Sequence, residues 1–178
     1  RLSAEEILDK RSVEKLIDLK VPAVMVDYHI NNDRINCVDI DYFHGGYSTT
    51  NYIIKQGYDN IIYFAPDIKI PQEKERLKGV RAAIKENTDK KIDYREIIAG
   101  KTGSEYGKQI ESLLKKKIHI NKKNKTVLVV SWVNVAYSIL SEAARINLKI
   151  PEEIGVISLA GSFYANLSYP RLSTSDLP

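Results

Sequence analysis

Residues 37–65 read CVDIDYFHGGYSTTNYIIKQGYDNIIYFA, and this stretch decides the fold because its hydrophobic pattern changes twice. Residues 37–40 are mostly apolar, which predicts a short strand. Apolar side chains then recur at helical spacing through 43–56, and Gly57 supplies a C-terminal stop. The run NIIYFA at 60–65 is apolar on consecutive residues, which indicates a strand buried on both faces. The stretch therefore predicts a strand, a helix and a second strand in succession.

The same alternation extends in both directions from this stretch. Towards the N-terminus, residues 4–19 predict a helix, and VPAVMV at 21–26 predicts a short buried strand. Towards the C-terminus, helices are expected at 72–87, 103–117 and 134–146, and strands at 93–98, 126–130 and 155–159. Strands of this kind predict an α/β fold, in which a parallel sheet has helices above and below it. Ligands bind such sheets beyond the carboxyl ends of the strands.

The composition is that of an ordinary globular protein, with 178 residues, 43% hydrophobic and 28% charged. The net charge of +4 is too small a bias to indicate nucleic-acid binding. The apolar runs are far shorter than a membrane span, so no membrane partner is expected. Cys37 is the only cysteine, which excludes an internal disulfide and a thiolate metal cluster and favours a reducing compartment.

Gly100-Lys101-Thr102 looks like the end of a phosphate-binding loop. The full signature needs a glycine five positions earlier, where this chain has Arg95, so the backbone could not wrap the phosphates in the required way. Thr102 followed by Glu105 instead predicts a capping box at the start of a helix. A nucleotide cofactor is therefore not expected.

The sequence also gives no catalytic or metal-binding set. His29, His44 and His119 have no ligand spacing among themselves or with Cys37, and no serine lies in a Gly-x-Ser-x-Gly motif. We therefore expect no enzyme activity, no metal and no cofactor.

Five phrases, in this order and spacing, resemble the effector-binding core of the lactose-repressor/galactose-repressor family of bacterial transcription regulators. They are VPAVMVD (21–27), CVDIDYFHGGYSTTNYIIKQGYDNIIYFA (37–65), ERLKGVRAAIKE (75–86), LKIPEEIGVIS (148–158) and YPRLSTSDLP (169–178). The resemblance implies a fold like that of periplasmic binding proteins, with two doubly wound parallel-sheet lobes and a ligand cleft between them. Residues 1–58 would form part of an incomplete N-terminal lobe, 59–165 the C-terminal lobe, and 166–178 a crossover returning to the first lobe.

The resemblance also implies two ligand-binding residues. Asp41 matches an acidic residue that faces the cleft, where a carboxylate can accept two hydroxyl donors, although it could instead serve only as a helix N-cap. Arg76 matches an arginine that projects into the cleft, where its planar fork suits paired hydroxyls, a carboxylate or a phosphate. The alternative for Arg76 is a surface arginine among neighbouring charged residues.

The chain departs from the family pattern where two strands end. After the strand at 126–130 the family carries Asn-Asp or Ser-Asp, and this chain has Ser131, a further candidate ligand-binding residue, followed by Trp132. Two aspartates expected after residue 158 are also absent. Trp132 could stack on a pyranose or heterocycle, fill the space of a ligand, or turn into the core. Phe64 could line the same cleft or belong to the core.

These features favour the effector-binding and dimerising core of a cytoplasmic transcriptional regulator, a repressor of carbohydrate-utilisation genes. The expected partners are a sugar or sugar derivative, a second copy of the chain, and operator DNA bound through a helix-turn-helix upstream of Arg1. One alternative is an extracytoplasmic sugar-binding protein of a transporter. Another is a regulator controlled by a protein partner, with a vestigial pocket.

Overall fold

The computed structural model describes residues 14–15, 17–19, 22–27, 34–66, 70–99, 103–115 and 125–175. Of the helix predicted at 4–19, residues 14, 15, 17 and 18 are helical and most of the remainder lies outside the described residues. The predicted capping box cannot be placed either, because Thr102 and the side chain of Glu105 are also outside them.

The main body of the molecule is a five-stranded parallel sheet. Its strands run in the order β4 (Asp93–Ala99), β3 (Asn60–Pro66), β5 (Thr126–Val130), β6 (Gly155–Ser158) and β7 (Ser173–Thr174). The helices are α3 (Tyr42–Lys55), α4 (Pro71–Glu86), α5 (Gly103–Lys115) and α6 (Val133–Arg145), with a 3₁₀ turn η1 at Phe163–Leu167. These bounds agree with the sequence-based ranges to within about two residues, as expected for element ends.

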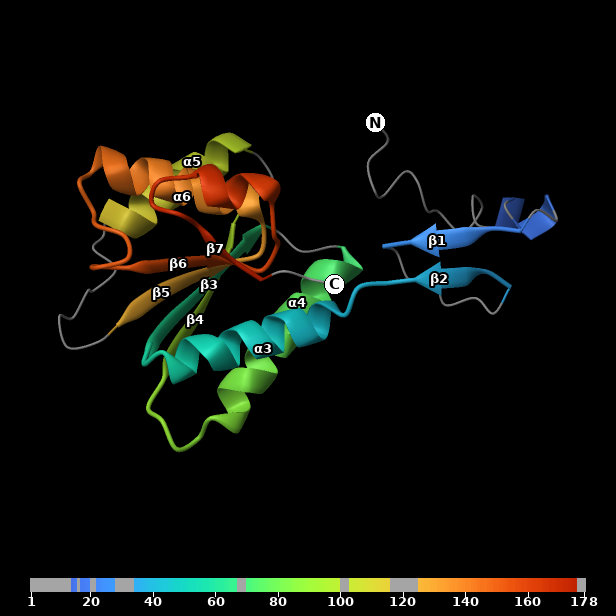
Figure 1. Ribbon diagram of the computed structural model, residues 1–178, viewed down its shortest axis with the longest axis horizontal. Coiled ribbons are helices and arrows are strands. Elements are labelled where there is room, and N and C mark those ends of the chain that lie inside the picture. The colour runs from blue at the N-terminus through green and yellow to red at the C-terminus, as the bar shows by residue number, and fades with distance from the viewer. Residues whose placement is uncertain are drawn as a thin grey trace.

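Helices cover both faces of this sheet, with α5 and α6 on one side and α3 and α4 on the other (Figure 1). Strand β3 shows the reason, because its side chains alternate between two hydrophobic clusters. Ile62 and Phe64 pack in the cluster with α5 and α6, whereas Ile61, Tyr63 and Ala65 pack in the cluster with α3 and α4. The predicted parallel sheet with helices above and below is confirmed.

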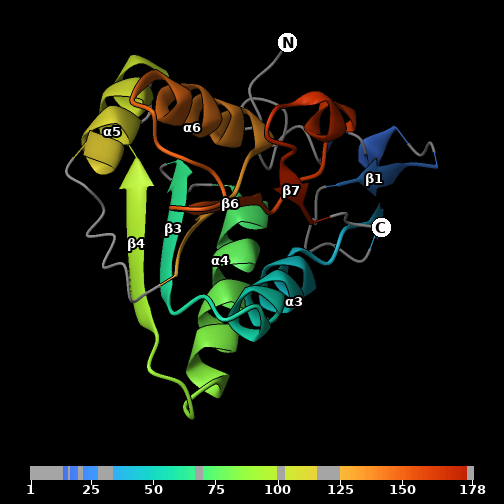
Figure 2. The same ribbon diagram turned by 60° about the vertical axis from the view of Figure 1, so that its left-hand side comes forward.

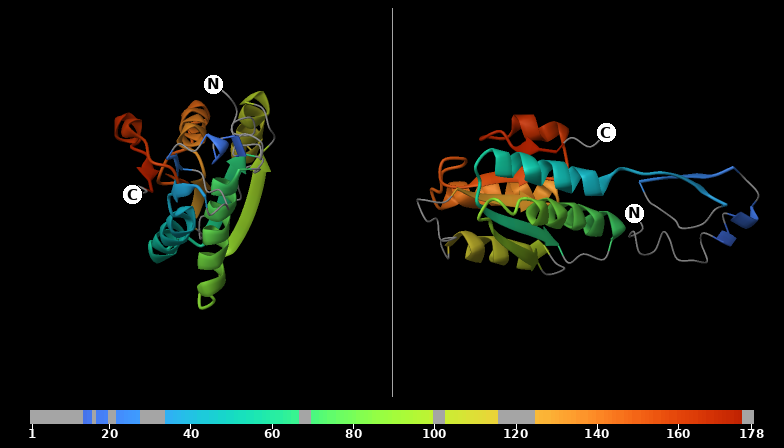
Figure 3. Two further views of the ribbon diagram at one scale, coloured as in Figure 1. Left: turned by 90° about the vertical axis from the view of Figure 1, so that its right-hand side faces the viewer. Right: turned by 90° about the horizontal axis from the view of Figure 1, so that it is seen from below.

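A second, two-stranded parallel sheet lies at one end of the molecule, away from the main body (Figures 1 and 3). It pairs β1 (Val24–Val26) with β2 (Asn36–Val38). The sequence predicted a buried strand here, but Val26 is 71% exposed and Val38 is 60% exposed. The prediction of burial, which was made for residues 21–26, is wrong for β1, because none of the described residues covers Val24 and Val26.

Helix α3 belongs to the main body, which changes the predicted domain boundary. The sequence placed residues 1–58 in the N-terminal lobe, yet Ile53 and Ile54 of α3 are buried in one cluster with β3 and α4. The passage from the small sheet to the large one therefore falls between β2 and α3. The apolar face of α3 explains the difference, because it is buried against the sheet that follows it in sequence.

The C-terminal stretch also stays with the main body as far as it is described. Residues 166–178 were predicted to return to the first lobe, but Ser173 and Thr174 pair in parallel with Ile157 and Ser158 of β6. Residues 176–178 lie outside the described part of the chain. The return predicted for this segment is therefore not seen through residue 175.

Glycines hold α3 and α4 unusually close together, and Figure 2 shows the two helices side by side. A Cβ atom built at Gly79 of α4 would overlap the carbonyl oxygen of Phe43, and one built at Gly46 of α3 would overlap the carbonyl oxygen of Arg76. Both backbones thus approach where only hydrogen atoms fit. This contact fixes the N-terminal part of α3 against the middle of α4.

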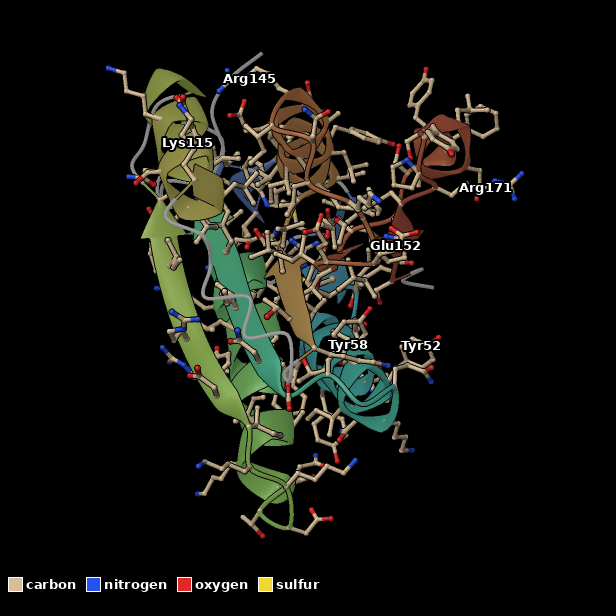
Figure 4. The ribbon with its side chains drawn as sticks, turned by 90° about the vertical axis from the view of Figure 1, so that its left-hand side faces the viewer. Tyr52, Tyr58, Lys115, Arg145, Glu152 and Arg171 are labelled. Atoms are coloured by element: carbon tan, nitrogen blue, oxygen red, sulfur yellow. The ribbon has the colours of Figure 1, made fainter. Side chains whose placement is uncertain are left out.

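Figure 4 views the molecule from the side opposite the β1–β2 sheet. At this end Tyr58 lies near Lys125, whose ammonium nitrogen is 6.0 Å from the centre of the ring. Lys115 of α5 and Arg145 of α6 both pair with Glu111, in ion pairs of 2.5 and 3.1 Å at the surface. These contacts are surface ion pairs and a cation–ring contact of the kind found in most proteins. In parallel sheets of this type, ligands bind at the carboxyl ends of the strands.

Candidate functional site

The carboxyl ends of the main strands point towards the β1–β2 sheet (Figure 1). Helix α4 follows β3 and helix α6 follows β5, so both helices begin at this end of the body. Their first residues bring together Glu73 and Arg76 from α4 and Trp132 from the start of α6.

Glu73 is the centre of this group. Its side chain is 1% exposed, and its Oε1 atom accepts hydrogen bonds from Arg76 Nη1 and from Trp132 Nε1, the latter at 2.6 Å. Arg76 is buried as well. Charge-assisted bonds of this kind are stronger than neutral ones, and a carboxylate and a guanidinium withdrawn from water compensate each other's charge.

Tyr42, the first residue of α3, joins the group from the other helix. The guanidinium carbon of Arg76 lies 4.5 Å from the centre of the Tyr42 ring, in a cation–π arrangement. The Tyr42 hydroxyl donates a hydrogen bond to the carboxylate of Asp27. Burial of the Tyr42 hydroxyl, followed by this bond to Asp27, raises the pKa of Tyr42 well above its ordinary value. The hydroxyl therefore stays protonated and remains a donor.

Asp27 connects the small sheet to the main body. It follows β1 directly and has a φ angle of 60°, a left-handed conformation that aspartate tolerates better than most residues. Its carbonyl oxygen accepts a hydrogen bond of 2.7 Å from Gln72 Nε2 of α4. A continuous set of contacts thus runs from Asp27 through Tyr42 and Arg76 to the Glu73–Trp132 bond.

Several buried polar atoms at this end have no hydrogen-bond partner among the residues that the structure describes. They include Glu73 Oε2, Arg76 Nε and Ser131 Oγ. Buried polar atoms are paired in the great majority of cases, so these three leave room for a partner beyond the described residues, which water or a bound polar molecule can supply. Glu73 Oε2 can only accept, Arg76 Nε can only donate, and the Ser131 hydroxyl can do either.

The structure unites part of the set predicted from sequence. Arg76 and Trp132 meet through Glu73, and Ser131, immediately before Trp132, is fully buried at the end of β5. The surface alternative for Arg76 is wrong, because the side chain is buried. Trp132 is 38% exposed, so it has not turned into the core.

Asp41 caps helix α3. Its carboxylate accepts a hydrogen bond of 2.7 Å from the backbone N–H of His44, and the side chain is exposed. This confirms the capping role that the sequence left open. Ligand contact by Asp41 stays a prediction, since a capping carboxylate keeps a second oxygen.

Phe64 lies in the core, not at the site. It is fully buried in the cluster with α5 and α6, which also contains Ile110 and Ile139. The predicted ligand contact is therefore not supported. The reason is the two-residue period of β3, which turns Phe64 towards the helices on one face of the sheet.

Sequence analysis missed Glu73, Tyr42 and Asp27. Glu73 had one signal, since it stands three residues before Arg76 and side chains at that spacing meet on a helix. Arg76 has several charged neighbours in sequence, so this spacing alone does not distinguish Glu73 from the others. Tyr42 follows the cap residue Asp41, a position that no spacing rule links to Arg76. Its contact depends on how α3 crosses α4.

No group of three or more histidine, cysteine, aspartate or glutamate side chains that could hold a metal ion occurs in the described ranges. No helix in those same ranges has the length and apolarity needed to cross a bilayer.

Comparison with known proteins agrees with this geometry. Residues 50–178 match the family described as periplasmic binding protein-like domain. The HTH-type transcriptional regulator DegA of Bacillus subtilis is 26% identical over 168 residues, which are 94% of this chain and 48% of DegA. The chain spans about half the length of the curated relatives it matches.

Solved structures give the same result. The transcription regulator CcpA of Lactococcus lactis superimposes with a TM-score of 0.70 at 29% identity, covering 94% of this chain and 59% of that one. A PurR family transcriptional regulator from Vibrio parahaemolyticus has a TM-score of 0.76 at 23% identity, covering 93% of this chain and 61% of that one, and supports the fold. The chain therefore belongs to the periplasmic binding protein-like domain family and has the effector-binding core of the lactose-repressor/galactose-repressor regulators.

Proposed function

We propose that this chain is the effector-binding and dimerising core of a bacterial transcriptional regulator, a repressor of carbohydrate-utilisation genes. The observation that carries the proposal is the cluster of Glu73, Arg76, Ser131 and Trp132 at the carboxyl ends of β3 and β5, with unpaired buried polar atoms in it. Ligands bind parallel α/β sheets at these ends.

The proposed ligand is a sugar or a sugar derivative. Hydroxyl groups both donate and accept, so they match a set that includes one acceptor, one donor and one serine hydroxyl. The partly exposed Trp132 ring offers an apolar face on which a sugar ring can stack, while its N–H is held by Glu73. Asp41 is the further hydroxyl acceptor in this proposal.

The proposed switch depends on the link between the two sheets. Asp27 after β1 contacts Gln72 of α4 and Tyr42 of α3, so the small sheet is attached to the helices that carry the site. A ligand that contacts Arg76 while Tyr42 packs on its guanidinium can favour one arrangement of the two sheets. It must bind that arrangement better by a few kcal/mol to act as a switch.

The remaining parts of the proposal concern the whole protein. Similarity to DegA and CcpA supports operator DNA as the second partner, a cytoplasmic location and binding rather than catalysis. A homodimer is supported by large apolar side chains exposed on and after η1, namely Phe163, Tyr164, Leu167 and Tyr169. The transporter-protein alternative is not favoured, because the similar proteins are regulators.

One observation favours a second candidate, a regulator controlled by a protein partner with a vestigial pocket. Glu73 already accepts hydrogen bonds from Arg76 and from the Trp132 indole, which are the two groups expected to hold a ligand. Under this alternative, no sugar would stabilise the protein.

The test is a thermal-shift screen of sugars and sugar derivatives on the purified protein. A ligand present at about one hundred times its dissociation constant should add about 2.7 kcal/mol to the free energy of unfolding. We expect Arg76→Ala to abolish the shift and Arg76→Lys, which keeps the charge and the fold of the helix but loses the planar fork, to weaken binding at least tenfold.

The control is Arg81→Ala on the same helix, because Arg81 is exposed and pairs with Glu96. It should leave the ligand response unchanged. A full response in both Arg76 variants would remove Arg76 from the site, and a screen in which no compound stabilises the native protein would favour the protein-partner alternative.

A further inference from the structure

We propose that Glu73 sets the charge selectivity of the site, so that it accepts uncharged polyhydroxy ligands and rejects their phosphorylated or carboxylated forms. This inference rests on the proposed small-molecule site at Arg76 and Trp132. It assigns a role to a residue whose importance is visible only in the folded protein.

The first support is the charge balance of the site. Glu73 and Arg76 are the only buried charged residues among those that the structure describes, and they are paired with each other. Their charges cancel before any ligand arrives. A neutral ligand leaves this balance intact, whereas an anion would place a second negative charge beside the buried carboxylate, with Arg76 already neutralised.

The second support is the identity of the atoms that are still unpaired. Glu73 Oε2 needs a donor and Arg76 Nε needs an acceptor. Hydroxyl groups can meet both needs, because each hydroxyl donates and accepts. The ionised oxygens of a phosphate or carboxylate accept only, so they would satisfy Arg76 Nε and repel Glu73 Oε2.

The third support is the bond between Glu73 and Trp132. One oxygen atom of Glu73 receives both the Arg76 and Trp132 donors, so the carboxylate fixes the indole and the guanidinium together. An anion that displaced Glu73 from Arg76 would also break the 2.6 Å bond to Trp132. Selection against anions and the position of the stacking ring therefore depend on the same side chain.

The test compares the intact protein with its Glu73→Gln variant, in which an amide oxygen can still accept from Arg76 and Trp132. Trp132 is the only tryptophan, so its fluorescence reports binding directly. Each protein is titrated with a panel of monosaccharides, with the phosphorylated form of each, and with inorganic phosphate at constant ionic strength. Glu75→Gln is the matched control, because Glu75 lies on the same helix and pairs only with the exposed Lys78 in the described structure.

We expect the native protein to bind a free sugar at least tenfold more tightly than its phosphate and to show no response to inorganic phosphate. In Glu73→Gln the net charge at Arg76 becomes positive, so affinity for inorganic phosphate and for sugar phosphates should rise at least tenfold. Glu75→Gln should behave as the native protein does.

Different failures point to different conclusions. A native protein that binds a sugar phosphate more tightly than the free sugar would overturn the selectivity while leaving the small-molecule site intact, and this comparison needs no variant. Unchanged phosphate affinity in a folded Glu73→Gln would also overturn it. No response to any compound by either protein would overturn both this inference and the proposed function, whereas a gain of phosphate binding in Glu73→Gln alone would support the role of Glu73 without a sugar ligand.

Discussion

Strands β3 and β1 are similar as sequences but differ in their surroundings. Both are short runs of apolar residues, yet Ile61–Ala65 of β3 is fully buried and Val26 of β1 is 71% exposed. Strand β3 has neighbours on both edges and helices on both faces, whereas β1 pairs only with β2 within the described residues. A run of apolar residues thus indicates a strand, but whether that strand is buried depends on what packs against it.

The largest expected effect is the difference in stability between truncating a side chain in β3 and truncating one in β1. Phe64→Ala removes a fully buried ring from the core and should lower the free energy of unfolding by about 3–5 kcal/mol. Val26→Ala removes exposed atoms and should change it by less than about 0.5 kcal/mol. Urea unfolding of both variants measures the difference. A small effect of Phe64→Ala would mean that Phe64 is not a core residue, and the ligand contact once predicted for it would return.

The second expected effect concerns the close contact between α3 and α4. Gly79→Ala introduces a Cβ that overlaps the Phe43 carbonyl, so we expect a loss of about 1–3 kcal/mol from overpacking. Gly107→Ala is the matched control within another helix, α5, where a Cβ would meet nothing within 4 Å. It should stabilise the protein by about 0.4–1 kcal/mol, because alanine restricts the unfolded chain.

Chemical denaturation of both glycine variants measures whether each substitution raises or lowers the free energy of unfolding. Because Gly46 and Gly79 hold the helices that carry Tyr42 and Arg76, Gly79→Ala should also weaken any ligand response seen in the thermal-shift screen. Stabilisation by Gly79→Ala would show that α3 and α4 are free to separate, and the packing of Tyr42 on Arg76 would then lose its structural basis.

Sequence reasoning predicted the main body well because its elements are determined locally. The strand at 126–130 has the bounds that the run TVLVV predicts, and α6 differs from its predicted range by one residue at each end. The domain boundary at residue 58 is a different kind of prediction, because it does not follow from local pattern alone. Local patterns show that α3 is a helix with one apolar face, but they do not say which of two sheets that face covers.

The site could be predicted only in part, for a related reason. Arg76 and Trp132 were identified because a family resemblance and the position after a strand point to the carboxyl end of the sheet. Glu73 lies within the segment QEKE at 72–75, in which three of the four residues are charged. Its complete burial follows from the direction in which α4 enters the body, a tertiary property that the charge pattern does not encode.

The smallest effect concerns an ion pair at the outer edge of the main body. Glu96 of β4 accepts hydrogen bonds from Arg81 Nε at 2.7 Å and Arg81 Nη2 at 2.6 Å, and a further one from Tyr94 at 2.8 Å. The bonds from Arg81 lower the pKa of Glu96, so the folded protein binds fewer protons than the unfolded chain in mild acid. The ion pair with Arg81 therefore stabilises the folded protein. This stabilisation is fully present above the ordinary glutamate pKa of about 4.3 and is lost as the pH falls through the lowered pKa of Glu96.

We therefore expect Glu96→Gln to reduce stability at about pH 6 and to have a shrinking effect as the pH approaches about 3. The reduction should not exceed about 1 kcal/mol, because the Arg81 side chain is 57% exposed and solvent screens the pair. Thermal melts of the native protein and the variant across this range measure it, and subtracting the two curves removes the other carboxylates that titrate in the same window. A difference that stays constant with pH would show that Glu96 stabilises the edge of the sheet by packing, since only the charged carboxylate benefits from the Arg81 guanidinium.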